Sequence, residues 1–230
     1  MKELTRLSYL IGDGTDKLSH KTVLVLGLGG VGGYVVEVLV RSGVGHIILV
    51  DYDQVDITNI NRQLIALQDT VGMNKTDAWE ERIHAIMPTC KVTKITEKIT
   101  EENMDMLFMN TVDFVVDACD TTIVKCLLIK KCLENHIPFI SSMGTANKLD
   151  PTKLEIIDIR KTSYDPIAKV IRNYVKKERL RGKVPVVCSK ESPMKLDGKL
   201  GTIVTVPASC GFLLSHYALK QLLEENSYDL

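Results

Sequence analysis

Four glycines near the start of the chain have the spacing of turns that bind nucleotide phosphates. They lie in the run Gly27-Leu28-Gly29-Gly30-Val31-Gly32. In a Gly-x-Gly-x-x-Gly turn the first glycine permits a tight bend and the second lets the backbone approach a phosphate. The third allows close packing of helix on strand. The turn predicts a bound nucleotide, but alone it suits a nicotinamide or flavin cofactor as well as ATP.

Polar residues that follow the turn decide between these nucleotides. They are Asp51, Asp53, Asn59, Arg62 and Lys75. Asp51 ends the next predicted strand, where a carboxylate can accept hydrogen bonds from ribose hydroxyls. A diphosphate is largely neutralised by the helix N-terminus and needs no added cations, whereas a triphosphate calls for an arginine fork and a lysine. The set therefore favours ATP over a redox dinucleotide.

A carboxylate for a metal ion is available at Asp120, just after a predicted strand over residues 112–117. Parallel sheets bind ligands at the carboxyl ends of their strands. Mg²⁺ is usually held there by one or two carboxylates together with substrate phosphates. The sequence therefore predicts ATP and Mg²⁺ as the ligands, with Asp120 on the metal.

Each of these residues also has a plain structural interpretation. Lys75 and Asp53 could be solvated surface charges, and Arg62 could pair with Asp56. Asp120 could cap the following helix. The occurrence of all of them in this order favours the nucleotide site.

The elements that must position these residues alternate between buried strands and amphipathic helices. Strands are expected over residues 22–26, 46–50, 91–95, 112–117 and 138–142. Helices are expected over residues 31–42, 73–86, 101–108 and 121–134. Repeated strand–helix–strand units predict an α/β fold with a mostly parallel sheet, a Rossmann-like three-layer sandwich.

The pattern changes after Asp150-Pro151. Expected there are a strand over residues 154–159, a basic helix over 166–181, an irregular stretch over 182–201, a strand over 203–206 and a helix from about Ala208. We expect residues 1–150 to form an ATP-binding core and residues 151–230 to form a C-terminal α+β elaboration of the same domain.

Composition bounds the class of protein. The net charge of the 230 residues is zero, so no global attraction to nucleic acid is expected. The six cysteines never form a Cys-x-x-Cys pair, which argues against a zinc knuckle and suits reduced thiols in the cytoplasm. Residues 1–8 lack the apolar run of a signal peptide, and residues 203–219 are too short and interrupted for a membrane span.

One segment is strongly basic despite the neutral total. Residues 160–183 hold nine basic side chains against two acidic ones, a net charge of +7. Such a segment can contact several phosphates of a nucleic acid. The alternative is a solvated amphipathic helix with an apolar face of Ile167, Val170, Ile171, Tyr174 and Val175.

The combined motifs resemble the ubiquitin-activating-like adenylating family. They are Gly27–Gly33, Asp51-Tyr52-Asp53, Asn59-Ile60-Asn61-Arg62-Gln63 and Val71-Gly72-x-x-Lys75. The resemblance implies ribose binding by Asp51, phosphate binding by Asn59, Arg62 and Lys75, and magnesium binding by Asp120. It also implies a homodimer, in which Arg6 of each subunit reaches into the other subunit's site.

Within this family the chain is most similar to the tRNA threonylcarbamoyladenosine dehydratases. The similarity lies in residues 150–158, 161–166 and 186–193, and in the lack of zinc cysteine pairs and of a rhodanese-type domain. It implies ATP-dependent cyclisation of threonylcarbamoyladenosine in tRNA, with a sulfur-transfer protein as a further expected partner. Thr121 departs from the asparagine found in many adenylators of carrier proteins.

Three other functions stay open at this point. One is adenylation of the C-terminal glycine of a ubiquitin-like sulfur-carrier protein, and another is NAD-dependent oxidoreduction. The third is a scaffold that binds nucleotide without catalysis. Cys188, in a polar and loop-like setting, is the one candidate for a thioester intermediate.

Overall fold

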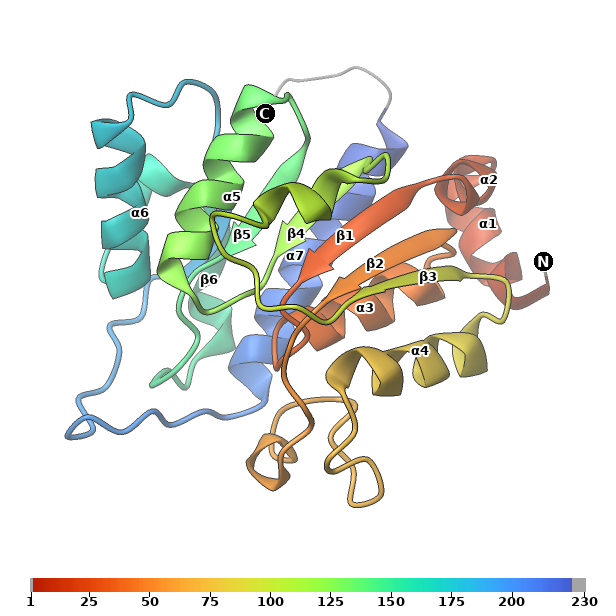
Figure 1. Cartoon of the computed structure of the whole chain (residues 1–230), viewed down its shortest axis with the longest axis horizontal. Helices are drawn as coiled ribbons and strands as arrows, with labels where there is room; N and C mark the ends of the chain where they lie inside the picture. Colours follow the sequence, from red (N-terminus) through yellow and green to blue (C-terminus); the bar gives the residue numbers. More distant parts are fainter. Residues whose placement is uncertain (1, 225–230) are drawn as a thin grey trace.

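A seven-stranded sheet organises the computed structural model, which describes residues 2–224 (Figure 1). Its strands are β1 (Thr22–Leu26), β2 (His46–Val50), β3 (Lys91–Ile95), β4 (Phe114–Asp117), β5 (Phe139–Ser142), β6 (Leu154–Asp158) and β7 (Pro185–Ser189). Their order is β3-β2-β1-β4-β5-β7-β6. All neighbours are parallel except β6 and β7, which are antiparallel. The Rossmann-like α/β prediction is confirmed.

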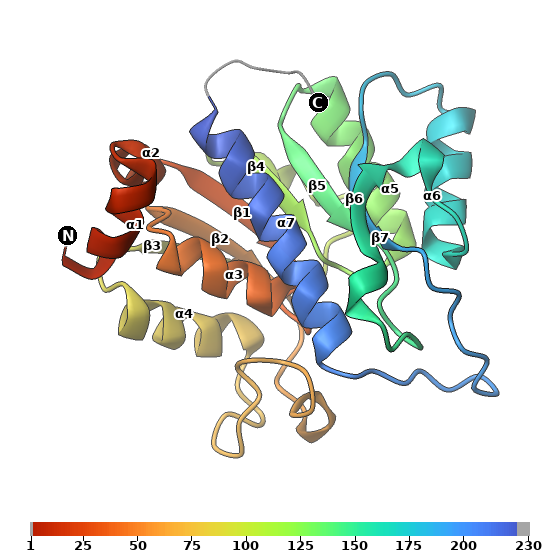
Figure 2. The same ribbon diagram turned by 180° about the vertical axis from the view of Figure 1, so that it is seen from behind.

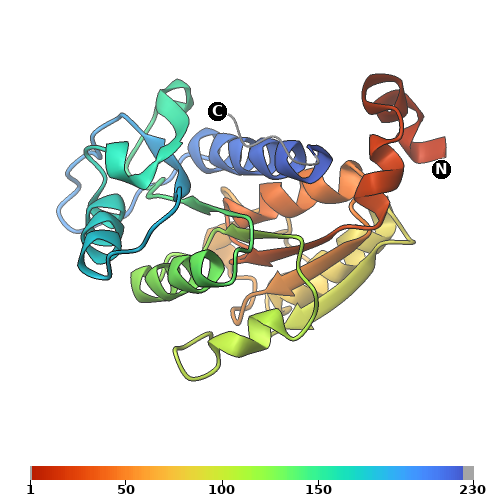
Figure 3. The same cartoon turned by 90° about the horizontal axis from the view of Figure 1, so that it is seen from above.

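Helices cover both faces of this sheet. They are α1 (Thr5–Ile11), α2 (Gly14–Ser19), α3 (Gly32–Arg41), α4 (Lys75–Ile86), α5 (Thr122–Glu134), α6 (Pro166–Lys177) and α7 (Thr205–Leu223). Short 3₁₀ turns lie at Lys2–Leu4, Ile57–Asn59, Met104–Phe108, Pro151–Lys153 and Ile159–Lys161. Figure 2 shows α7 beside α3 on one face, and Figure 3 shows α5 on the other.

The side chains of the central strand β1 point alternately into two hydrophobic cores, one on each face of the sheet. Val23 and Val25 of β1 pack with buried residues of α3, α4 and α7. Leu24 and Leu26 pack with buried residues of α5 and α6. Successive side chains of a strand point to opposite faces, and a strand covered on both faces is therefore apolar throughout. This explains why β1 is recognisable as an uninterrupted apolar run.

The order of the strands creates a crevice above β1 and β4. From β1 the chain continues outward to β2 and β3, and then returns to β4 on the other side of β1. Leu26 at the end of β1 is in register with Asp117 at the end of β4. Ligands of open α/β sheets bind at this reversal of direction, outside the carboxyl ends of the strands. The glycine turn and Asp120 both leave the sheet at this place.

The C-terminal region differs from the prediction in two respects. Residues 182–201 are not irregular throughout, because they contain β7, whose residues 186–189 are buried between β5 and β6. The strand predicted over residues 203–206 is wrong, since α7 begins at Thr205 and includes them in part. Pro207 lies in the first turn of α7, where its missing N–H costs nothing.

Several helix ends also shift. The basic helix stops at Lys177 rather than residue 181, and Arg179 beyond it has a positive φ of 52°. Within 101–108 only Met104–Phe108 is helical, as a 3₁₀ turn. The helices α1 and α2 lie in a region for which the sequence predicted no element. None of the helices in residues 2–224 has the length and apolar character needed to cross a bilayer.

An ion-pair cluster ties α3 to α4 and makes stability depend on pH. Arg82 donates two hydrogen bonds to Glu37, of 2.7 and 2.9 Å, and Arg41 donates one of 2.7 Å. Burial acts to raise the pKa of Glu37, but the two arginines outweigh it and hold the pKa below its ordinary 4.5. A carboxyl with a lowered folded-state pKa stabilises the fold above its unfolded pKa and loses that contribution on acidification.

We therefore expect Glu37→Gln to lower the free energy of unfolding by about 1–2 kcal/mol at pH 7. The difference from wild type should shrink as the pH falls below about 4.5. Urea unfolding at a series of pH values measures both effects. A difference that widens at acid pH would contradict the role given to Glu37.

Candidate nucleotide site

The glycine turn bends tightly at the carboxyl end of β1. Gly27 has φ of 87°, a conformation that favours glycine, and its N–H donates to Val50 O at 2.8 Å. A Cβ on Gly32 would lie 1.8 Å from Gly27 O, so the start of α3 packs directly on the turn. A Cβ on Gly29 would meet nothing nearer than the Gln63 side chain at 3.6 Å. The amides that open α3 therefore face the crevice, where they favour an anion.

Asp51 holds the turn and lies next to a buried lysine. Its carboxylate accepts hydrogen bonds from Leu28 N at 2.7 Å and from Asp53 N at 2.9 Å. Lys75 Nζ lies 3.7 Å from Asp51 and 2.8 Å from Asp53. Burial raises the pKa of Asp51, and the charge of Lys75 opposes that rise. The solvated-surface interpretation is wrong for Lys75, which is only 5 % exposed, whereas Asp53 is exposed but paired.

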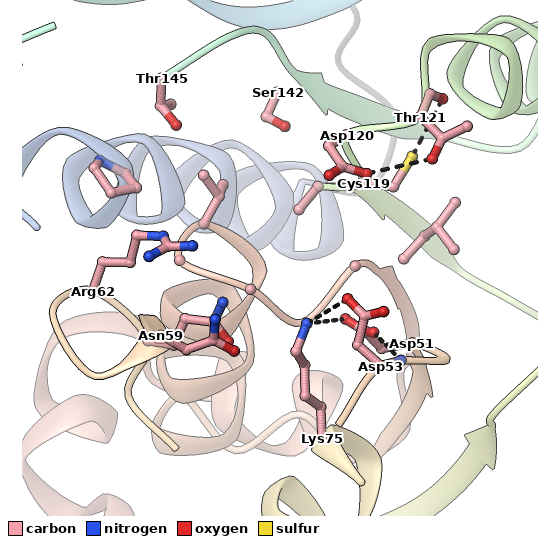
Figure 4. Close-up of a pocket in the computed structure, with 18 of the residues that line it drawn as sticks. Asp51, Asp53, Asn59, Arg62, Lys75, Cys119, Asp120, Thr121, Ser142 and Thr145 are labelled. Carbon is pink, nitrogen blue, oxygen red and sulfur yellow. Dashed lines mark hydrogen bonds and ion pairs between the residues drawn. The ribbon is translucent and has the colours of Figure 1, made fainter. Parts of the chain in front are cut away.

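Asn59 and Arg62 come from the loop between β2 and α4. Asn59 Oδ1 accepts from Asp56 N at 3.2 Å, closing the 3₁₀ turn whose first residues Asp56 caps. Arg62 Nη1 donates to Thr58 O and to Asn61 Oδ1, both at 2.9 Å. Arg62 therefore does not pair with Asp56. In Figure 4 Asn59 and Arg62 lie on the same side of the cavity as Lys75.

Asp120 follows β4 on the opposite side of the cavity (Figure 4). It is exposed, and the N-cap of α5 is Thr121, without a side-chain cap from Asp120. The turn before it is held by Asp117, which accepts from Cys119 N at 3.2 Å and lies 3.1 Å from Lys125 Nζ. Asp117 and Lys125 are each 1 % exposed. A rigid buried pair thus supports a solvent-accessible carboxylate.

These groups border one cavity of about 1130 Å³. Of the residues predicted for the site, its wall contains Gly27, Gly29, Gly30, Asp51, Asp53, Asn59, Arg62, Lys75 and Asp120. Gly32 lies behind the turn, packed on Gly27. Arg6 is exposed on α1, which Figures 1 and 2 place at the amino end of the strands, away from this wall. Arg6 therefore does not complete the cavity of its own subunit.

Other wall residues were not predicted. They include Gln63, Lys98, Lys125, Ser142, Thr145, Ile167 and Thr202. Gln63 directly follows Arg62 in the motif over residues 59–63, so its position in the sequence could have indicated that it belongs to the site. Ser142 ends β5 and Thr145 follows it, and the carboxyl end of β5 borders the same crevice, so the topology could have located both residues.

Cys188, the cysteine predicted for a thioester, does not belong to the cavity wall. Cys188 is not loop-like, because it lies in β7 and is only 3 % exposed. Burial raises the pKa of its thiol to about 11, so the thiolate needed for a thioester is scarce at neutral pH. All six cysteines are free thiols, and all but Cys119 are buried.

The donor set suits a metal ion that arrives with its nucleotide. Residues 2–224 contain no cluster of three or more His, Cys, Asp or Glu side chains that could hold a metal by itself. Asp120 offers an accessible carboxylate on the side of the cavity opposite Lys75. Mg²⁺ bound through one carboxylate plus phosphate oxygens fits this arrangement, whereas a permanent protein-held ion does not.

The fold and the cavity together define a nucleotide-binding α/β protein, with cations and a carboxylate arranged around a phosphate-binding turn. The model of the ThiF family matches residues 2–229, and the chain belongs to this family.

Named relatives extend this finding. The chain is 49 % identical over 195 residues to a tRNA threonylcarbamoyladenosine dehydratase of Bacillus subtilis, covering 84 % of this chain and 77 % of the relative. It is 33 % identical to the Escherichia coli protein of the same name, covering 87 % and 85 %. A crystal structure of the E. coli enzyme in complex with ATP superposes with a TM-score of 0.91 at 32 % identity, covering 96 % of this chain and 94 % of that one.

Proposed function

We propose that this protein uses ATP to activate the carboxylate of threonylcarbamoyladenosine in tRNA and then cyclises that group. The main support for the proposal is that one cavity is lined by the glycine turn, Arg62, Lys75 and Asp120. The names of the similar dehydratases, and the ATP in the E. coli structure, supply the substrate class.

The first step forms an acyl-adenylate. A carboxylate oxygen of the substrate attacks the α-phosphorus of ATP, the bond to the β-phosphate oxygen breaks, and pyrophosphate leaves. Negative charge develops on the phosphate oxygens, where the amides of the glycine turn, Arg62 and Lys75 can stabilise it. Asn59 orients the phosphates by hydrogen bonding, and Asp51 accepts from the ribose.

The second step needs no protein nucleophile. The carbamoyl group of the substrate attacks the activated carbonyl carbon and releases one of its N–H protons to solvent, and AMP leaves with the former carboxylate oxygen. The nucleoside thereby loses one water. Asp120 would hold Mg²⁺, which would neutralise part of the charge on the phosphates.

The basic segment supports a tRNA substrate. Eight of the nine basic residues of 160–183 are exposed, and Arg172 is partly exposed. The buried face of α6 is Ala168, Ile171 and Val175, so its lysines point away from the core. Val170, predicted to be buried, is 50 % exposed. A phosphate backbone on this face would give the salt-sensitive affinity that such contacts produce.

The assembly and location are further parts of the proposal. A homodimer would let Arg6 on α1 of one subunit reach the phosphates in the other subunit's cavity. A sulfur-transfer protein is a proposed partner. We place the protein in the cytoplasm because six free thiols suit a reducing compartment.

The test is mass spectrometry of nucleosides from threonylcarbamoylated tRNA incubated with enzyme, ATP and Mg²⁺. Loss of one water from the modified adenosine is expected, together with pyrophosphate release. Pyrophosphate exchange stimulated only by a sulfur-carrier protein, or saturable NAD binding without ATP binding, would reject the proposal.

A further inference from the structure

An ion pair that the proposed chemistry does not use lies just behind the cavity wall. Lys148 Nζ is 2.9 Å from Asp165 Oδ2, and both side chains are 1 % exposed. Lys148 also donates a hydrogen bond to Gly144 O. Neither residue belongs to the cavity wall, so neither contacts a nucleotide bound there. Burying two charges seldom stabilises more than an apolar pair of similar volume, which leaves stability alone as a poor explanation.

The same carboxylate fixes the start of α6. Asp165 Oδ1 accepts a hydrogen bond from Ala168 N at 2.9 Å and is the N-cap of that helix. The two oxygens of Asp165 therefore make different interactions: Oδ1 caps α6, and Oδ2 forms the ion pair with Lys148. A displacement of Lys148 would be transmitted to the first turn of the basic helix.

Lys148 is connected in turn to the cavity. Gly144, Thr145 and Ala146 form part of the wall. A Cβ on Gly144 would come within 2.9 Å of Asp165 Oδ2, so this wall segment runs directly against the carboxylate. Ile167, in the first turn of α6, also borders the cavity.

This part of the wall shares its side of the cavity with Asp120 and lies opposite two other groups proposed for the triphosphate. Figure 4 shows Thr145 and Ser142 on the side of the cavity opposite Asn59 and Lys75. Behind it, α6 carries exposed basic residues toward the surface, including Lys169 and Lys176. The pair thus connects the wall over residues 144–146 with the first turn of the basic helix α6.

We infer that Lys148 and Asp165 are positioning residues that set α6 and the wall over residues 144–146 for the tRNA substrate and not for ATP. This inference rests on the proposed function. It predicts that loss of the pair raises the KM for the tRNA substrate and leaves the KM for ATP nearly unchanged.

The variants are chosen to leave no uncompensated buried charge. The double variant Lys148→Met with Asp165→Asn removes both charges, and the asparagine oxygen still caps α6. Ile83→Val, on the buried face of α4, is the control for simple loss of stability. Circular dichroism and thermal melting establish that each variant is folded.

For the double variant we expect the KM for threonylcarbamoylated tRNA to rise about tenfold, within the range by which supporting residues modulate coupling. The KM for ATP should change less than about twofold, and Ile83→Val should change neither constant. Equal constants for the double variant and wild type, or equal rises for both substrates, would overturn the positioning role alone. Absence of product with the wild-type enzyme would reject the proposed function and this inference together.

Discussion

Replacement of Lys75 by methionine should reduce ATP–pyrophosphate exchange by roughly 10²–10³-fold, the effect of removing one preorganised donor from a developing anion. Lys75 is buried and lies 2.8 Å from Asp53 and 3.7 Å from Asp51. Its ammonium group is thus fixed before a nucleotide arrives, and no side-chain freedom is lost on binding. Methionine has a similar length and keeps the packing without the charge. The rate of exchange at saturating ATP, together with the KM for ATP, measures the loss.

A second lysine of the same cavity provides the matched control. Lys98 also belongs to the wall, but it is exposed and stacks over the Tyr52 ring at 5.5 Å. Exposed charges contribute little, so Lys98→Met should change exchange by less than about threefold. If the two variants behaved alike, or if Lys75→Met retained more than a fifth of the wild-type rate, the triphosphate would not lie against Lys75.

The removal of Lys75 also affects its neighbour. Burial already raises the pKa of Asp51, and Lys75 is the largest influence that opposes it. Without the lysine the pKa of Asp51 should rise further, so residual activity of Lys75→Met should increase at higher pH. A residual rate that is flat across neutral pH would mean that Asp51 is ionised without its partner.

The elements that the sequence predicts correctly are those whose pattern depends only on residues close together in the chain. Strands β1, β2 and β3 have their predicted bounds because each is a short run closed by turn residues or glycine. The glycine turn is likewise recognisable from six consecutive residues, in which Gly32 packs directly on Gly27. Sequence patterns of this kind depend on neighbours in the chain, so no tertiary information is needed to find them.

The unpredicted part depends on distant partners. β7 is five residues long and includes Cys188 and Ser189, and it becomes a strand by pairing with β5 and β6. Lys125 resembles any surface lysine of a helix until β4 places Asp117 3.1 Å away. Lys148 and Asp165 are likewise brought together by folding. Buried charges of this sort follow from topology, and their spacing in the chain carries no signal.

Alanine substitutions at two glycines of the turn should have different effects. Gly32→Ala should destabilise the fold, whereas Gly29→Ala should weaken nucleotide binding. At Gly32 a Cβ would lie 1.8 Å from Gly27 O and 3.2 Å from the Ala118 side chain, so backbone must move. Overpacking of this kind costs about 1–3 kcal/mol or more. For a chain of this size that corresponds to roughly 2–4 °C in Tm for each kcal/mol.

Gly29→Ala should fold normally, because its Cβ meets only Gln63 at ordinary contact distance, 3.6 Å. The methyl group faces the cavity, where the second glycine of such a turn admits a phosphate. We therefore expect an unchanged Tm and an ATP affinity lowered about tenfold or more, equivalent to 1.4 kcal/mol. Thermal melting and calorimetric titration with ATP measure the two quantities on the same samples. If Gly29→Ala bound ATP as tightly as wild type, the phosphates could not approach this turn, because the added methyl group would occupy their place.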